Sequence, residues 1–436
     1  MDDVAEDDLS VSSEITMRQK LTDEMSYDDL IEIENEIFKC MDEYLLDDIL
    51  QISNPIYHVK LHSTITELMY ETINSLYDLE EYEESHKEIS DFVRERIDIY
   101  NETILTPQRS CSVRDNFVHT NDIGKIKQQI DCLRGSYQPT QRTTDWYEYR
   151  YNLLTASNIG KILGSDAKKN SLIYEKCKPL LINDMKTSVN VNSPLHWGNK
   201  YEPVSLMLYE NIYNTIVEDF GCIRHRTIQC LGASPDGINT DITSKLYGRM
   251  VEIKNVVNRE ITGIPLEAYW IQMQTQMEVC NLDECDFFET QFKEFNTCEE
   301  FHNSNKKYTG VILYFIANSD SGSNPHYVYM PMSLDKSKDS INTWTQDIVA
   351  NLNETHKLHN TLYWYLDIMS CVLVQRNILW FSALSPHIIS TWKIIESERL
   401  TGYEHRKPKQ KNRKCNIVIQ NETVHIIDEN VKVIKF

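Results

Sequence analysis

The sequence predicts an α/β protein with a central mixed β-sheet flanked by helices, a helical N-terminal module and a short β extension at the C-terminus. Apolar patterns with helical and strand-like spacing alternate after residue 145, which is typical of a sheet covered by helices. The 436 residues are 41% hydrophobic and 25% charged, so the chain can bury a core. At this length we expect a main domain of about 200–250 residues with appendages.

Cysteine usage and hydropathy exclude several classes of protein. The 11 cysteines are scattered from Cys40 to Cys415 and form no Cys-x-x-Cys pair, which favours a reducing compartment over a disulfide scaffold or zinc site. Cys280 and Cys285 are interpreted as small apolar residues at a helix–strand junction. No run of about 18 apolar residues occurs, and the acidic start after Met1 is unlike a signal peptide. We therefore expect an intracellular protein without a membrane span.

The negative charge is concentrated at one end of the chain. The formal net charge is −22, and residues 1–110 hold 29 Asp and Glu against 8 Lys and Arg, so the remainder is nearly neutral. Such asymmetry predicts a separate acidic module. It is interpreted as a solvated helical surface, with mimicry of nucleic acid or docking of a basic partner as the alternative. The predicted segments are a disordered acidic tail (1–13), an acidic helical module (14–120), a main domain (139–400) and a basic tail with a β-ribbon (401–436).

Helical spacing of apolar residues predicts most of the helices. About three are expected between residues 28 and 96, followed by a linker over 107–116. A polar, lysine-rich loop is expected after the helix that starts at Ser157. The helices expected after the linker cover residues 145–153, a segment from 157, 197–213, 265–280, 336–355 and 379–397.

Short apolar runs bounded by turn residues predict the strands. The segment 217–231 contains strand-like runs, and 232–237 is a turn because it holds Ser-Pro-Asp-Gly. The remaining strands are expected over 246–257 and 286–292, in a hairpin of 311–317 with 327–331, and in a C-terminal ribbon of 416–420 with 431–436.

The segment Val251-Glu252-Ile253-Lys254 is the most informative in the sequence. On a strand, Glu252 and Lys254 share one face while Val251 and Ile253 enter the core. Alone, this would be an ordinary ion pair. However, Asp236 lies in the Ser-Pro-Asp-Gly turn, and 15 residues separate it from Glu252. Two carboxylates at adjacent strand ends can share a hard divalent cation such as Mg²⁺, which prefers oxygen ligands, with Lys254 beside the reacting water or phosphate.

Two flanking helices carry further candidates. Glu202 lies near the start of the helix 197–213, where a carboxylate can simply stabilise the helix dipole. In the helix 265–280, Gln272 and Gln276 are four residues apart and share a face, whereas Gln274 points elsewhere. Glutamines beside buried apolar residues need hydrogen-bond partners.

The order Glu202, Asp236, Glu252-x-Lys254, Gln272 resembles the PD-(D/E)XK nuclease superfamily, and in detail its lambda-exonuclease or YqaJ-type viral recombinase branch. A second block supports the branch. Arg150 ends the run that starts at Trp146, and Ser157 of a Thr-Ala-Ser motif follows seven residues later, with the family's spacing. The resemblance covers about residues 145–292, and it implies a restriction-endonuclease-like core.

The resemblance also implies roles for single residues. Asp236 and Glu252 would bind Mg²⁺ (or Mn²⁺ in its place), with Glu202 and the backbone oxygen of Ile253 as further ligands. Lys254 would orient the attacking water, and Gln272 would brace the site. Arg150 and Ser157 would bind a terminal phosphate. Thr155 would cap the helix that starts at Ser157, so that free amides face the phosphate.

The activity implied is that of a metal-dependent 5′→3′ exodeoxyribonuclease at duplex DNA ends, which produces 3′ single strands for viral DNA recombination, replication or repair. The expected source is a large DNA virus, and the expected location is the host nucleus or a cytoplasmic viral replication site. A single-strand annealing protein and a second copy of the chain are further expected partners. The alternatives are an RNA- or DNA-cleaving endonuclease of the same fold and a non-catalytic nucleic-acid-binding protein.

Basic and aromatic segments complete the predictions. Residues 405–414 hold six Lys and Arg, which favours phosphate contacts or nuclear import about equally with a solvated loop. The residues 363–365 with Trp380 and Phe381 are interpreted as core, and His225 as structural. The candidate contacts to nucleic acid are Lys168, Lys169, Arg406, Lys407 and Lys409.

Overall fold

The computed structural model describes residues 21, 25–77, 79, 84–104, 107–112, 122–141, 143–180, 190–191, 193–318, 325–408 and 434–435. The chain divides into two compact units. The first comprises Met1–Ile49 with Ile56–Thr106, and the second Leu50–Pro55 with Pro107–Phe436. None of the helices in the described ranges combines the length and the apolar character needed to cross a membrane.

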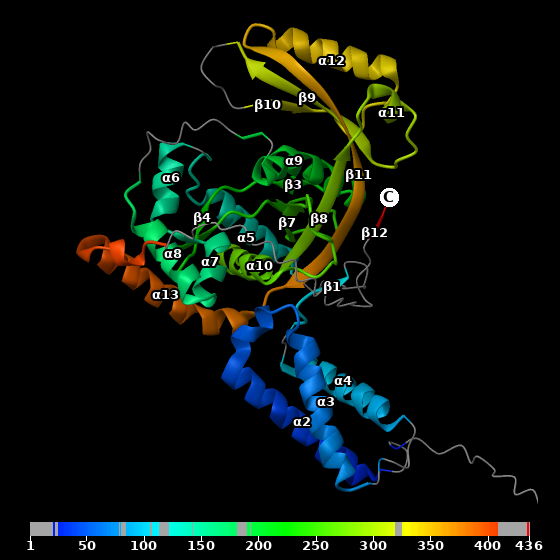
Figure 1. Cartoon of the computed structure of the whole chain (residues 1–436), viewed down its shortest axis with the longest axis vertical. Helices are drawn as coiled ribbons and strands as arrows, with labels where there is room; N and C mark the ends of the chain where they lie inside the picture. Colours follow the sequence, from blue (N-terminus) through cyan, green and yellow to red (C-terminus); the bar gives the residue numbers. More distant parts are fainter. Residues whose placement is uncertain are drawn as a thin grey trace, which may run out of the picture. The chain divides into compact units, whose positions relative to one another are not determined.

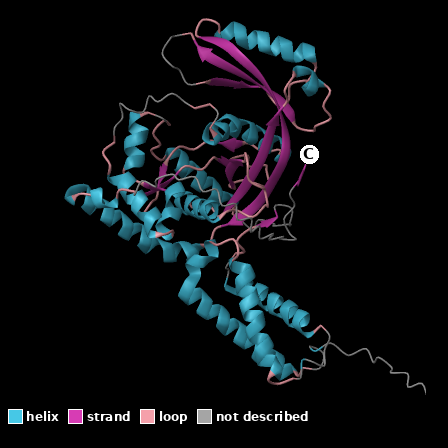
Figure 2. Cartoon of the chain, viewed as in Figure 1, coloured by secondary structure: helices cyan, strands magenta, loops and turns pink. Residues whose placement is uncertain are grey.

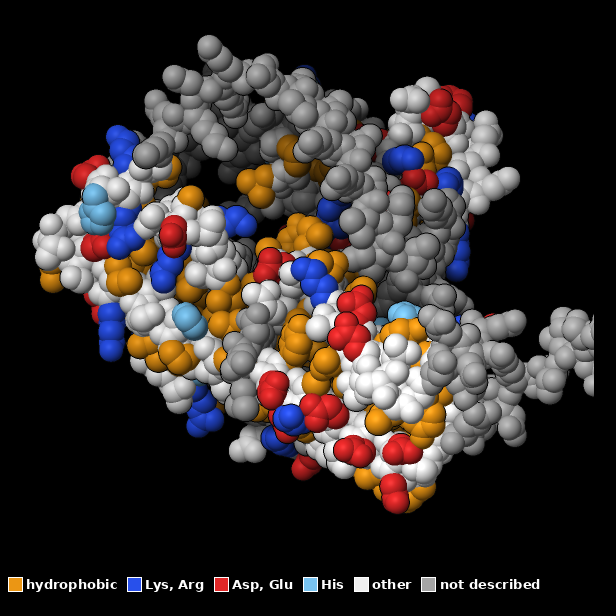
Figure 3. Space-filling view, turned by 60° about the horizontal axis from the view of Figure 1, so that its bottom comes forward, with side chains coloured by type: hydrophobic (Ala, Val, Ile, Leu, Met, Phe, Trp, Pro, Cys, Tyr) orange, Lys and Arg blue, Asp and Glu red, His pale blue; other side chains and the backbone are white. Residues whose placement is uncertain are grey.

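The first unit contains three helices that pack on one another, α2 (Tyr27–Asp48), α3 (Tyr57–Asn74) and α4 (Ser85–Ile104) (Figure 1). Each buries residues three or four positions apart, as in the series Ile89, Val93 and Ile97 of α4. Between these contacts the surface is acidic, and Figure 3, which turns this unit forward, shows acidic side chains with apolar ones among them. The three helices predicted for this region are confirmed.

The second unit is built on a mixed sheet whose strand order is β10-β9-β11-β8-β7-β6-β3, with β1 and β12 also paired to β11. The pair β7–β8 is parallel and the other pairs are antiparallel. The strands of this sheet are β1 (Cys111–Ser112), β3 (Val217–Glu218), β6 (Gly237–Asn239), β7 (Met250–Asn255), β8 (Glu284–Glu294), β9 (Thr309–Ala317), β10 (His326–Tyr329), β11 (His356–Gln375) and β12 (Ile434–Lys435). A small second sheet contains β2 (Leu154–Thr155), β5 (Leu231–Ala233) and β4 (Ile223–Arg224).

Helices flank the main sheet, as Figure 2 shows, so the predicted α/β class is confirmed. On one side, Tyr201 and Val204 of α9 share a core with Val251 and Ile253 of β7. On the other side, Glu252 of the same strand reaches α10, because alternate residues of a strand face opposite sides. The helices of this unit are α5 (Ile123–Gly135), α6 (Thr144–Tyr151), α7 (Ala156–Leu163), α8 (Asp166–Cys177), α9 (Pro194–Tyr213), α10 (Glu267–Cys280), α11 (Cys298–His302), α12 (Lys338–Leu352) and α13 (Ile378–Thr401), with short 3₁₀ helices at Ile49–Ser53 and Glu404–Arg406.

Several predicted elements need correction. The lysine-rich loop expected after α7 is the helix α8, which buries Leu172, Ile173 and Cys177 against its neighbours. The expected linker 107–116 contributes β1, and the expected turn 232–237 is shortened by the ends of β5 and β6. The expected aromatic core is confirmed for Trp380, whose ring meets Trp270 at 4.9 Å.

The largest omission of the sequence analysis is β11, a strand of 20 residues. It pairs with β8 from Trp364 to Gln375 and with β9 from His356 to Tyr365, and the register shifts at two bulges. Of the expected C-terminal ribbon, Ile434–Lys435 forms β12 on β11, and residues 416–420 lie outside the described residues.

Candidate active site

The turn that carries Asp236 joins the two sheets. It follows β5 of the small sheet and leads into β6 of the main sheet. Gly237 is required here, because a Cβ at this position would lie 2.2 Å from Val217 Cγ1. Asp236 Oδ2 accepts a hydrogen bond from the backbone amide of Ile253 at 2.7 Å, which ties the turn to β7. The structure therefore brings Asp236 beside the predicted Glu-x-Lys segment.

Glu252 is completely buried, and nitrogen donors surround its carboxylate. Oε1 accepts hydrogen bonds from Lys254 Nζ and, at 2.7 Å, from Gln272 Nε2. Oε2 accepts one from Gln276 Nε2 at 2.8 Å. A buried charge is tolerated only when it is paired and hydrogen-bonded, and this one is both. The predicted association of Glu252, Lys254 and Gln272 is thus present.

The negative charges of Asp236 and Glu252 repel each other. Burial, and next the negative charge of Glu252, raise the pKa of Asp236 well above its usual value, against the opposing effect of Lys254. Burial disfavours the charged form of Lys254, but the carboxylates of Glu252 and Asp236 outweigh it and raise the pKa of Lys254. The ammonium group also lies 5.1 Å from the ring centroid of Tyr269.

This donor set fits a hard divalent cation. The buried carboxylate of Glu252, the half-buried carboxylate of Asp236 and the carbonyl oxygen of Ile253 are oxygen atoms of the kind that Mg²⁺ accepts, and Mg²⁺ keeps several waters. Within the described ranges, no three His, Cys, Asp or Glu side chains gather closely enough to hold a metal ion by themselves. Glu202 is exposed on α9, yet its charge also raises the pKa of Asp236. Its role as a further ligand stays a prediction.

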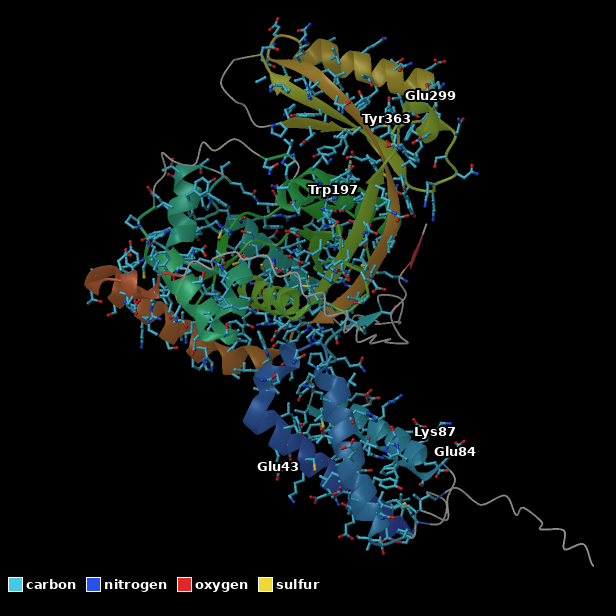
Figure 4. The ribbon with its side chains drawn as sticks, viewed as in Figure 1. Glu43, Glu84, Lys87, Trp197, Glu299 and Tyr363 are labelled. Carbon is cyan, nitrogen blue, oxygen red and sulfur yellow. The ribbon has the colours of Figure 1, made fainter. Side chains whose placement is uncertain are left out.

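Helix α9 is fixed rigidly to the sheet near Glu202. Lys200 is buried, pairs with Glu294 of β8 at 2.7 Å and lies 4.3 Å from the ring centroid of Trp197, which is labelled in Figure 4. Tyr201 donates to the same Glu294 at 2.7 Å. These contacts fix the helix turn from which Glu202 projects.

The predicted phosphate-binding residues lie at the α6–α7 junction. Arg150 ends α6, rests 4.7 Å from the ring centroid of Trp146, and donates to Ser234 Oγ at 3.3 Å. Ser157 is exposed in the first turn of α7. The expected capping by the Thr155 side chain is wrong, because Thr155 Oγ1 lies 3.3 Å from Ser157 Oγ and caps no amide of the helix. Arg150 is thus joined, through Ser234, to the turn that carries Asp236.

Positive charge accumulates behind Arg150. The buried Lys176 donates to the Arg150 carbonyl oxygen at 2.8 Å, and Arg399 of α13 donates to the Tyr151 carbonyl at 2.9 Å. Burial, with the charges of Arg150 and Arg399 and against the opposing charge of Glu175, lowers the pKa of Lys176 to about 8. No carboxylate of the described ranges forms an ion pair with Arg150 or Lys176. Among the described residues, the cations at this junction thus have no direct carboxylate partner, and Glu175 acts on Lys176 only at longer range.

The predicted surface contacts are more scattered. Lys168 is exposed and Lys169 half-buried on α8, and Lys407 is exposed. Arg406 pairs with Glu398 at 2.5 Å and also contacts Asn170, so internal partners already hold it. Lys409 lies outside the described residues. The expected structural role of His225 agrees with the hydrogen bond that its Nδ1 accepts from the Ile228 amide at 2.9 Å.

Sequence reasoning missed three residues of this network: Gln276, Ser234 and Lys176. Only the first had a signal in the sequence, its position on the same helix face as Gln272. Gln274 turns away, donates to the Gln375 carbonyl at 2.7 Å and accepts from the Asn377 amide at 2.7 Å.

A cavity of about 550 Å³ lies between α5 and the β6–β7 loop and is lined, among others, by Lys125 and Arg226. None of the predicted site residues lines this cavity.

Comparison with known proteins shows a similarity in the part of the chain that carries this site. Residues 145–283 match the family model described as the YqaJ-like viral recombinase domain. The uncharacterized protein R354 of Acanthamoeba polyphaga mimivirus is 28% identical in an alignment of 308 residues, and the match covers 61% of this chain and 54% of that protein. The chain thus spans about half the length of this relative. The predicted resemblance to YqaJ-type recombinases of large DNA viruses is confirmed.

Solved structures with weaker similarity include exonucleases. The alkaline exonuclease LHK-Exo from Laribacter hongkongensis is 18% identical over 59% of this chain and 94% of its own, with a TM-score of 0.34. A phage related exonuclease from Haemophilus somnus 129PT is 13% identical over 56% of this chain and 94% of its own, with a TM-score of 0.30. Because these TM-scores are low, the α/β fold is assigned from the strand order and the flanking helices of this chain alone.

Proposed function

We propose that the protein is a metal-dependent DNA exonuclease that hydrolyses phosphodiester bonds from the 5′ ends of duplex DNA. The observation that carries this proposal is the convergence of Asp236, Glu252 and Lys254 where the turn before β6 meets strand β7, within the region similar to the YqaJ-like viral recombinase domain. Two carboxylates and an ammonium group at one point are suited to phosphodiester hydrolysis with Mg²⁺ or Mn²⁺.

Asp236 and Glu252 would hold the divalent cation, whose chemistry is polarisation of the phosphate and activation of water. Lys254 keeps its proton at neutral pH because its pKa is raised. It therefore acts as a charged donor that stabilises negative charge on the phosphate and orients the attacking water, and not as a general base. Gln272 keeps the carboxylate of Glu252 in place at 2.7 Å.

The positive region around Arg150 supports recognition of a terminal phosphate. Arg150 and Lys176 lack carboxylate partners among the described residues, and Arg150 reaches the turn of Asp236 through Ser234. An arginine and the exposed hydroxyl of Ser157 would bind a dianionic 5′-phosphate next to the carboxylates. The family description further favours a role in viral DNA recombination. A single-strand annealing protein, a second copy of the chain and the viral replication site stay predictions.

The test is an assay of end-labelled duplex DNA in Mg²⁺ and Mn²⁺, with a 5′-phosphate or a 5′-hydroxyl, beside the matching RNA duplex. We expect release of mononucleotides from the 5′-phosphorylated DNA and loss of this release in Glu252→Gln. The control is Glu260→Gln, the same chemical change at an exposed loop position. Degradation by Glu252→Gln at the wild-type rate would refute the site. Preference for RNA, or internal cleavage, would replace the exonuclease by an endonuclease.

A further inference from the structure

Gln276 occupies a special position between the two carboxylate-bearing segments. It lies in the middle of α10 and is 1% exposed. Its side-chain nitrogen donates to Glu252 Oε2 at 2.8 Å and to the Ser234 carbonyl oxygen at 3.2 Å. Both partners only accept hydrogen bonds, so the orientation of the amide is fixed with its NH₂ group toward them.

The two partners belong to different parts of the fold. Ser234 precedes Asp236 by two residues in the turn between β5 and β6, whereas Glu252 lies in the middle of β7. One NH₂ group therefore links the turn that carries the first carboxylate to the second carboxylate itself. The hydrogen bond from the Ile253 amide to Asp236 closes the same arrangement from the strand side.

The other end of the Gln276 amide shows what this position requires. Among the described residues, the buried Oε1 of Gln276 has no hydrogen-bond partner. An unsatisfied buried acceptor costs about 1–3 kcal/mol. The fold tolerates this cost while both N–H groups of the same amide are hydrogen-bonded. This indicates that a glutamine at position 276 is useful for its NH₂ group and not for its carbonyl oxygen.

We propose that Gln276 is a positioning residue that sets the separation of the Asp236 and Glu252 carboxylates and so determines the affinity of the site for divalent cations. The inference deepens the proposed function and rests on it for the identity of the ligand. Gln276 is buried, and its side-chain nitrogen is hydrogen-bonded to Glu252 and Ser234. It would therefore act through these two residues and not on the substrate directly. Groups that orient metal ligands typically change metal affinity by 10–100-fold when replaced.

The chain offers a matched control on the same helix. Gln274 is equally buried, at 1% exposure, and also makes two hydrogen bonds, to Gln375 and Asn377. These partners belong to the end of β11 and the start of α13, away from the carboxylates. Replacing Gln274 by Met therefore reproduces the loss of a buried glutamine without touching the candidate cation site.

The experiment compares wild type, Gln276→Met, Gln276→Asn and Gln274→Met as full chains. Mn²⁺ binding is measured by electron paramagnetic resonance in the absence of DNA, and thermal unfolding is measured in parallel. We expect both Met variants to lower Tm by roughly 3–10 °C. Only the changes at 276 should weaken Mn²⁺ binding, by roughly tenfold to a hundredfold for Met. Asn, which withdraws the amide by about 1.5 Å, should show a smaller loss and provides a variant with less effect on folding.

The outcomes separate this inference from the proposed function. Wild-type affinity for Mn²⁺ in folded Gln276→Met or Gln276→Asn overturns the positioning role, as does an equal loss in Gln274→Met. Absence of Mn²⁺ binding in the folded wild type instead overturns the proposed metal-dependent function. With DNA present, kcat should fall in the 276 variants while KM for the DNA stays near the wild-type value, because Gln276 is only 1% exposed and is out of reach of a substrate.

Discussion

The two ends of the candidate site carry opposite charge in similar surroundings. At one end, Asp236 and Glu252 are pushed together, and the pKa of Asp236 is raised. At the other end, Arg150, Lys176 and Arg399 gather, and the pKa of Lys176 is lowered. Burial is the largest cause of each shift and like charges add to it, whereas Lys254 at the first end and Glu175 at the second oppose it. The comparison teaches that each end gathers groups of one sign, which is the arrangement expected if the proposed site takes a cation at the first end and a phosphate at the second.

The two ends also differ in rigidity. The carboxylate of Glu252 is completely buried, and donors on β7 and α10 hold both its oxygens. Arg150 is only half-buried, and its side chain donates to Ser234 at 3.3 Å. Ser157 is exposed. Changes at the first end should therefore affect chemistry, and changes at the second should affect choice of substrate.

The largest effect should come from Lys254. Replacing it by Met removes the cation that pairs with Glu252 and that, in the proposed function, stabilises the phosphate, so kcat should fall by about a thousandfold. The measurement is the single-turnover rate on duplex DNA with a 5′-phosphate. Lys245→Met, an exposed change in the same domain, is the control. A loss below tenfold would show that the ammonium is an ordinary structural partner of Glu252.

Lys176 tests the positive end through stability. Its folded pKa is about 8, below the usual value of 10.5, so between these pH values the unfolded chain holds a proton that the folded chain has lost. The free energy of unfolding contributed by this residue therefore rises with pH across that window, by about 3 kcal/mol, and is constant below it. Denaturation of wild type and Lys176→Met from pH 7 to 11 measures the difference. If the free energies of unfolding of the two proteins change with pH in parallel, the pKa of Lys176 is not lowered in the folded chain.

Arg150 should control the choice of DNA end. Arg150→Met removes a charge-assisted contact to the terminal phosphate, so the preference for a 5′-phosphate over a 5′-hydroxyl should drop by roughly tenfold to a hundredfold. The ratio of kcat/KM on the two substrates is the measurement, with the exposed Arg226→Met as control. An unchanged ratio would separate the positive cluster from end recognition.

The smallest effect is expected at Arg406. Its guanidinium is engaged with Glu398 in a partly exposed pair, so Arg406→Met should lower the free energy of unfolding by about 1 kcal/mol or less. Because this pair already uses its charge, the salt dependence of DNA binding should stay unchanged, whereas Lys407→Met, an exposed residue, should reduce the slope by about 1 if Lys407 contacts a phosphate. A reduced slope for Arg406→Met would mean that DNA displaces Glu398.

The sequence was informative where chemistry is local. Glu252 and Lys254 share a strand face by the period of the strand, and Gln272 and Gln276 share a helix face by the period of the helix, so both pairs were predictable. The bond from Gln276 to Ser234, the position of Lys176 beneath Arg150 and the pairing of β11 depend on segments distant in the chain. No local pattern encodes such contacts. The helix α8 was missed because its polar face, with Lys168 and Lys169, hides the spacing of its buried residues.

The long strand β11 has a consequence for how this protein tolerates change. It pairs on one side with β8, which leads to β7 and the candidate site, and on the other side with β9 of the β9–β10 hairpin (Figure 1). A single-residue deletion in its regular part would move the following side chains of β11 to the opposite face of the sheet, in the pairing with β8 as well as with β9. The two bulges, at Leu366/Ile368 and Leu358/Asn360, already absorb a shift of register. Insertions and deletions in homologous chains should therefore be tolerated at those two points and be rare elsewhere along the strand.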